Sequence, residues 1–135
     1  MTIVDETLLL CYLLDDDPVE SPAARDVIAK GDAMTYPEIL ARTVITLRDV
    51  YHVPRSVIGA AVTTLLDDVS VDSKPTIVLA LRLFGTTELD FTDCLMVARN
   101  VSGGGTVATF DKPLMNEVMR AERSGRADAG GEGAR

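Results

Sequence analysis

The sequence predicts an α/β sandwich built around a mostly parallel sheet. Short segments rich in β-branched residues alternate with longer segments whose apolar residues recur at helical spacing. This alternation is typical of parallel sheets, because each parallel strand needs a crossover connection, which is usually a helix. The chain has 135 residues, 47% of them apolar and 25% charged. This length and composition are typical of one globular domain, and the chain is too short for two.

Four segments are predicted to be strands. The segment 106–110 is the clearest of them, because it combines β-branched residues with Phe110 and follows a run of three glycines. The second strand is only weakly predicted. The sequence contains no internal repeat. In chain order the predicted strands are 2–5, 32–35, 69–71 and 106–110.

The predicted helices are placed by apolar spacing and by the residues at their ends. Pro22 and Pro37 stand at helix starts, where proline is favoured, and glycines follow two helix ends. The glycine-rich segment 124–135 has no large apolar residue, so we expect it to be disordered and residues 1–123 to form the domain. The predicted helices are 7–14, 22–31, 37–51, 55–67, 74–84, 92–101 and 113–123.

Charge and hydropathy narrow the class of protein. The net charge of −8 speaks against a basic nucleic-acid-binding face. Two interpretations of the acidic residues remain open. Either they keep the protein in solution, or some of them form a pocket that binds a divalent cation, which in turn binds phosphate groups. The longest apolar run, 8–14, is far shorter than the roughly 18 residues that span a bilayer. We expect a cytoplasmic protein without a membrane segment, in which Cys11 and Cys94 are buried thiols.

Four acidic residues lie at the ends of predicted strands or at the start of a predicted helix. Asp5 follows the first predicted strand and Asp111 the last, while Asp90 and Asp93 bracket the start of a helix. Parallel strands end at one edge of a sheet, so these carboxylates are expected to converge there. Carboxylates at close range repel unless a divalent cation lies among them. The simpler interpretation is that each acid caps a helix or forms a turn.

Three segments of the chain carry motifs that occur in the same order in one known family. Segment 3–18 is similar to that family's first strand and helix. Segment 90–95, Asp-Phe-Thr-Asp-Cys-Leu, matches its second acidic motif, and segment 106–112 matches its last strand and final acid. By these segments the chain resembles the PIN-domain family, in particular the VapC-type toxins of bacterial toxin–antitoxin pairs. The resemblance extends over nearly the whole chain to about residue 118.

The resemblance implies a three-layer α/β/α sandwich and a ribonuclease that depends on Mg²⁺ or Mn²⁺. Under it, Asp5, Asp93 and Asp111 are the metal-binding and catalytic acids. It also implies an RNA substrate, a homodimer, and a cognate antitoxin protein whose C-terminal segment occupies the groove of the toxin.

Two positions depart from the family pattern. Thr7 stands where the family has an asparagine, and Arg42 where it has a metal-facing glutamate. Glu38 lies one helical turn before Arg42, so it either supplies the missing catalytic carboxylate or forms an ion pair with Arg42. Two functions therefore follow: a metal-dependent endoribonuclease with Glu38 in its site, or a catalytically degenerate PIN-like module that binds or regulates a partner.

A phosphoacceptor receiver domain is a third possibility, and the spacing disfavours it. Asp72 corresponds to the phosphoacceptor aspartate after the third strand of such a domain. Lys112-Pro113 corresponds to the Lys-Pro pair after its last strand. Asp72 follows Asp5 by 67 residues, which is too far along the chain for a regular receiver. The chain has one histidine, His52, at a predicted helix end, so Ser- or Cys-based hydrolysis is also disfavoured.

Overall fold

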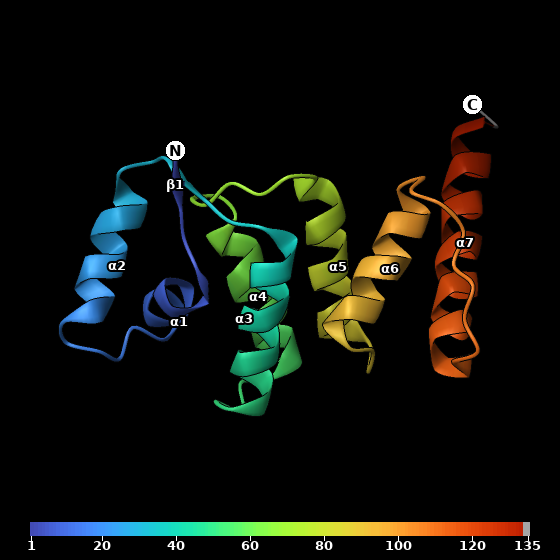
Figure 1. The fold of residues 1–135 in the computed structure, drawn as a ribbon. Coiled ribbons are helices and arrows are strands. Elements are labelled where there is room, and N and C mark those ends of the chain that lie inside the picture. The colour runs from blue at the N-terminus through green and yellow to red at the C-terminus, as the bar shows by residue number, and fades with distance from the viewer. Residues whose placement is uncertain (134–135) are drawn as a thin grey trace.

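The protein is mostly helical, with a sheet of only two strands (Figure 1). The computed structural model describes the backbone of residues 1–133 and the side chains of residues 1–124. Within that part, 65% of the chain is helix, in seven helices. In Figure 1 the helices stand side by side, with α1 and α2 at one end of the molecule and α7 at the other.

The helix predictions are confirmed to within a few residues. The apolar spacing locates each helix correctly, and Pro37 does begin a helix. The last helix is longer than predicted and continues to Gly133, through most of the segment for which we expect disorder. The expected disorder is thus not observed at residues 124–133, and residues 134–135 lie outside the described part of the chain. The helices are α1 (Glu6–Leu14), α2 (Glu20–Ala29), α3 (Pro37–Asp49), α4 (Arg55–Leu65), α5 (Lys74–Thr86), α6 (Phe91–Val101) and α7 (Lys112–Gly133).

The small sheet joins the first two predicted strands. β1 (Thr2–Ile3) runs parallel to β2 (Ala33–Met34), with Thr2 opposite Ala33. The predicted strand 69–71 reaches the same sheet through a single parallel bridge between Met34 and Ser70. The amide of Ser70 donates to Ala33 O, and Ser70 O accepts from the amide of Thr35, each at 2.9 Å. Three of the predicted strands therefore do lie together, but each pairs over only one or two residues.

The fourth predicted strand does not form in the described part of the chain. Segment 106–110 is extended but pairs with no strand, and Phe110 is fully exposed. Strand propensity reflects the fit of a side chain to a pleated, half-buried surface, and here no such surface covers Phe110. The prediction of a three-layer α/β/α sandwich with a mostly parallel central sheet is therefore wrong, because two strands of two residues cannot separate two layers of helices.

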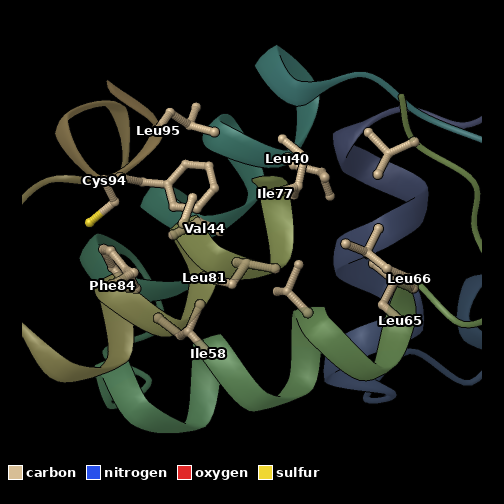
Figure 2. Packing of buried hydrophobic residues seen from close by; sticks show 14 of the residues in the cluster. Leu40, Val44, Ile58, Leu65, Leu66, Ile77, Leu81, Phe84, Cys94 and Leu95 are labelled. Carbon is tan, nitrogen blue, oxygen red and sulfur yellow. The ribbon is translucent and has the colours of Figure 1, made fainter. Parts of the chain in front are cut away.

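The hydrophobic core lies between α3, α4, α5 and α6 (Figure 2). Leu40 and Val44 of α3, Ile58 of α4 and Leu81 of α5 are fully buried members of this core. The rings of Phe84 and Phe91 pack edge to face, with centroids 6.0 Å apart. Such an edge-to-face pair adds about 0.5–1.5 kcal/mol to the stabilisation from burial. It joins the end of α5 to the start of α6.

Cys94 is buried as predicted, and Cys11 is only partly buried. Both are free thiols. The Cys11 Sγ lies 3.4 Å from a Glu20 carboxylate oxygen, and burial raises the pKa of the Cys94 thiol to about 11. In the described part of the chain, no helix combines the length and the apolar character that crossing a membrane requires.

Gly59 allows α4 and α5 to approach closely. A Cβ atom at this position would lie 2.8 Å from the backbone oxygen of Leu81. Gly85 lies near Gly59 on α5, but a Cβ there would meet Ser56 Cα at 3.4 Å and Arg55 O at 3.7 Å, which are ordinary contacts. The close approach of α4 and α5 therefore depends on Gly59 more than on Gly85.

We predict that Gly59→Ala destabilises the protein by about 1–3 kcal/mol, because the added methyl group must push the backbone of α5 away. Gly85→Ala is the matched control: it is also helical, and it is expected to be neutral or to stabilise by about 0.5–1 kcal/mol through helix propensity. Urea unfolding of both variants measures the difference. Equal stabilities would contradict the close packing described here.

Candidate functional site

The acids predicted from the sequence fall into two groups. Asp5 lies at the start of α1, while Asp90, Asp93 and Asp111 lie at the starts of α6 and α7. Helix α3 packs against both α1 and α6. The two groups therefore face different sides of one helix.

Asp5 caps α1. Its carboxylate accepts a hydrogen bond from the Thr7 hydroxyl at 2.7 Å and from the amide of Leu8 at 3.1 Å. These donors hold the pKa of Asp5 below its usual range, the Thr7 hydroxyl most strongly. Asp5 does follow β1, as predicted, and Thr7, which stands in place of the family's asparagine, is one of its hydrogen-bond donors. The carboxylate already has two partners from its own chain.

Glu6 is a functional candidate that the sequence analysis missed. One carboxylate oxygen accepts from the Thr46 hydroxyl at 2.7 Å, and the other lies 3.3 Å from Arg42 Nε. Arg42 and Thr46 are one helical turn apart on α3 and so share the face that meets α1. The spacing of Arg42 and Thr46 is visible in the sequence, but nothing in the sequence shows that α1 packs on that face.

Glu38 does not pair with Arg42, contrary to one of the two alternatives drawn from the sequence. The ion pair of Arg42 is with Glu6. Glu38 is exposed in the first turn of α3 and lines a cavity of about 500 Å³ together with Asp72 and Arg99. Its carboxylate is not near enough to the other predicted acids to complete a metal-binding group within the described residues.

Three acids lie where α6 and α7 begin: Asp90 directly before α6, Asp93 in its first turn, and Asp111 directly before α7. Burial raises the pKa of Asp93, and the negative charges of Asp90 and Asp111 raise it further. Asp111 accepts from the amide of Leu114 at 2.9 Å and so caps α7. Asp90 forms an ion pair with Arg48 at 3.2 Å. Asp93 is the half-buried one of the three.

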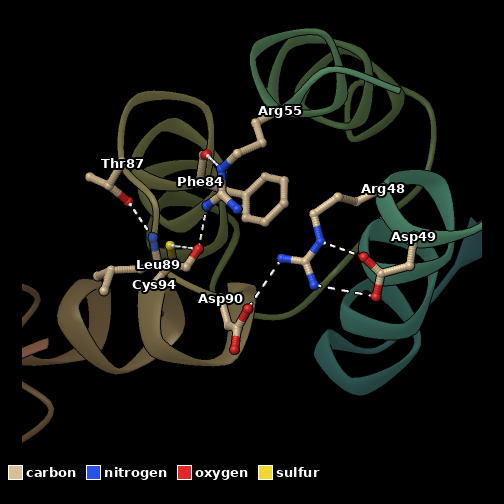
Figure 3. A network of polar contacts seen from close by, with 8 residues as sticks. All are labelled: Arg48, Asp49, Arg55, Phe84, Thr87, Leu89, Asp90 and Cys94. Carbon is tan, nitrogen blue, oxygen red and sulfur yellow. Dashed lines mark hydrogen bonds and ion pairs between the residues drawn. The ribbon is translucent and has the colours of Figure 1, made fainter. Parts of the chain in front are cut away.

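Two arginines hold the start of α6 in place (Figure 3). Arg55 lies over the ring of Phe84, 3.9 Å from its centroid, and donates to the backbone oxygens of Phe84 and Leu89. Arg48 joins Asp49 on α3 to Asp90. These contacts tie the connection between α5 and α6 to α3 and α4. They position the acids at the start of α6 but do not themselves form a reactive centre.

The complete set of predicted acids does not fit a metal site. Among residues 1–124, no three His, Cys, Asp or Glu side chains lie close enough together to hold a metal ion. Asp5 is separated from Asp93 and Asp111 because segment 106–110, which precedes Asp111, does not join β1. Mg²⁺ is often bound by only one or two carboxylates, with water and substrate phosphates completing its shell. Asp93 with Asp111 is the pair that matches that chemistry.

No protein-family model matches this chain, and no curated protein or solved structure does either. The resemblance to PIN domains thus rests on the three motifs alone. His52, the single histidine, is exposed in a left-handed turn after α3, consistent with its predicted place at a helix end.

We predict that Asp93 titrates above and Asp5 below the ordinary aspartate pKa of 3.8. The raised pKa means that Asp93 favours folding fully only below its unfolded pKa, and this contribution is lost as the pH rises through the folded value. Asp5 behaves oppositely: its contribution is present above the unfolded pKa and is lost as the pH falls through the folded value. Carboxyl NMR titration measures both.

Asp111→Asn is expected to lower the pKa of Asp93 by removing a nearby negative charge. Asp26→Asn, at an exposed position on α2, is the control and is expected to leave it unchanged. An Asp93 titration that is insensitive to Asp111 would mean that the two carboxylates are not neighbours.

Arg55→Lys is predicted to destabilise the protein by about 1–3 kcal/mol, because an ammonium group cannot stack on Phe84 and donate in the same fork geometry. Arg82→Lys, at an exposed position on α5, is the matched control and is expected to change stability by less than about 0.5 kcal/mol. Thermal and urea unfolding measure both variants. An Arg55→Lys protein as stable as the control would show that the network in Figure 3 is not needed.

Proposed function

We propose that the chain is a divalent-cation-dependent endoribonuclease of the PIN class, acting as the toxin of a toxin–antitoxin pair. The observation that carries the proposal is that Asp90 and Asp93 lie at the start of α6 and Asp111 at the start of α7, two helices that pack against each other. The order of the three acidic motifs along the chain also supports it. RNA is the substrate class in this proposal, and the cognate antitoxin and a second copy of the chain are its protein partners.

The electrostatics of Asp93 favour a cation-dependent activity. Its pKa is raised because a charged carboxylate is poorly solvated there and faces two others. When bound, Mg²⁺ or Mn²⁺ would lower the pKa of a water molecule and stabilise charge on the scissile phosphate. Asp93 and Asp111 are the residues proposed to hold it. Asp90 is already paired with Arg48, so its part is to keep α6 in position.

In this proposal Asp5 stabilises the start of α1 and takes no direct part in catalysis. Its two hydrogen-bond donors, the Thr7 hydroxyl and the Leu8 amide, belong to α1, and an N-cap aspartate stabilises a helix by about 1 kcal/mol. Glu38 has no proposed part in catalysis, because it lies beside Asp72 and Arg99.

The second candidate is a catalytically degenerate module that binds or regulates a partner. The ion pair between Glu6 and Arg42 favours it, because a permanent cation lies beside the acid that follows Asp5 in the sequence. An apolar groove of about 770 Å³ between α1 and α4, lined by Tyr12, Leu13 and Val57 among others, would suit a protein partner of such a module.

Cleavage of a labelled RNA panel tests the first candidate against the second. We expect cutting with Mg²⁺ or Mn²⁺ and none with EDTA. Asp93→Asn and Asp111→Asn are each expected to reduce the rate about a hundredfold or more, the scale of losing a group that stabilises transition-state charge. Asp26→Asn is the control for a charge change away from the site.

Asp5→Asn separates the two roles of Asp5. Asparagine caps helices as well as aspartate does, so the variant is expected to retain most of the activity. A hundredfold loss would instead assign Asp5 to the chemistry, as the family resemblance implies. A folded protein that cuts no RNA with either metal would favour the degenerate binding module.

A further inference from the structure

The segment 106–110 lies on the protein surface in the manner of an edge strand. It is the extended part of the connection between α6 and α7, at the end of the molecule away from α1 and α2 (Figure 1). Exposed and half-buried residues alternate along it, as they do in a strand with one covered face. Val107 packs against the hydrophobic core, whereas the exposed residues are Thr106, Ala108 and Phe110. One face of the segment is therefore held by the protein, and the other is open.

The backbone of this segment is also without partners in the described part of the chain. Within residues 1–124, no hydrogen bond joins the backbone of residues 106–110 to another segment. Phe110 is 107% exposed. Proteins usually protect such an edge with charged residues or proline, but residues 100–110 contain neither, in a chain of which 25% is charged. The segment is thus open to pairing with another strand.

We propose that segment 106–110 pairs antiparallel with the same segment of a second copy of the chain, in a two-fold dimer centred on Ala108. The inference deepens the proposed function and rests on it for the presence of a second copy. The contact itself does not require that the chain cuts RNA. In a two-fold contact both copies use the same patch, so the assembly closes at two copies.

The distribution of charge favours a second copy as the occupant of this edge. Two copies that each carry a net charge of −8 repel one another, so they meet most readily where neither presents a charge. Residues 100–110 form such an uncharged stretch of sequence, between Arg99 and Asp111. A surface without charge offers little electrostatic attraction to a basic partner, whereas it suits a copy of itself.

Charge and the fit of side chains also define the register of the pair. With Ala108 opposite Ala108 of the second copy, Phe110 lies opposite Thr106, and Asp111 lies opposite Gly105. An aromatic side chain opposite a β-branched one stabilises an antiparallel pair. A register centred on Asp111 would instead place two carboxylates directly opposite each other, which is destabilising. The register centred on Ala108 is therefore the one we propose.

Charge reversal at Ala108 tests the dimer and its register together. Ala108→Asp and Ala108→Lys each place like charges directly opposite one another, so each is expected to weaken dimerisation at least about tenfold. An equimolar mixture of the two variants places opposite charges there, so it is expected to recover association to within about threefold of the wild-type protein. Sedimentation equilibrium at a series of protein concentrations measures the dissociation constants. The interface is small, so the wild-type dimer is expected to dissociate on dilution.

The same charge changes at an exposed position on α2 are the matched controls. Ala23→Asp and Ala23→Lys, alone or mixed, are expected to leave dimerisation unchanged. Phe110→Ser is a second test that changes no charge. It is expected to weaken dimerisation at least about tenfold and to leave thermal unfolding of the monomer unchanged, because Phe110 has no burial to lose there.

Three results would overturn the inference. They are a wild-type protein that stays monomeric at every concentration, a dimer that tolerates the Ala108 and Phe110 substitutions, and a mixture of Ala108→Asp with Ala108→Lys that does not regain association. Slow hydrogen exchange of the 106–110 amides in dilute, monomeric protein would also overturn it, because those amides would then be paired within one chain. A wild-type dimer that cuts no RNA would count against the proposed nuclease and leave this contact intact.

Discussion

The burial of Leu40, Val44 and Leu47 fixes the rotation of α3, and both groups of polar residues depend on that rotation. These side chains form one apolar stripe, and turning the helix would expose it at a cost of about 1.5–3 kcal/mol for each residue. With the stripe buried, Arg42 and Thr46 meet Glu6 on one side, and Arg48 meets Asp90 on the other. A single packing requirement therefore places two arginines against two different sets of acids.

The two sets differ in how their charges are balanced. At the start of α1, each acid has partners from the chain itself: a hydroxyl and an amide for Asp5, a hydroxyl and a guanidinium for Glu6. At the start of α6, burial raises the pKa of Asp93, and the negative charges of Asp90 and Asp111 raise it further. The first set is thus balanced by donors of the chain, and the second retains a carboxylate whose charged form is disfavoured. That difference separates a structural role from a proposed catalytic one.

The helices were predictable and the sheet was not, for a physical reason. Helical hydrogen bonds are local, so apolar spacing and end residues such as Pro37 locate a helix from a short stretch of chain. A strand needs a partner that is distant in sequence, and segment 106–110 has high strand propensity but no partner within the described residues. The predicted α/β/α sandwich failed at that step, and the expected convergence of Asp5 with Asp111 failed with it, since it assumed a shared sheet edge.

The sequence alone determined the elements and the local roles of single residues. Cys94 is buried and His52 follows the end of a helix, as the residues around each of them in the sequence predict. For Asp5 and Asp111 the sequence left a cap or turn and a metal site open, and the structure shows that both cap helices. Only the tertiary structure decided which residues meet. The partner of Arg42 is Glu6 and not Glu38, although Glu38 is the closer in sequence, because α1 packs on the face of α3 that carries Arg42. Packing of helices far apart in the chain is decided by the whole core, and no local pattern contains it.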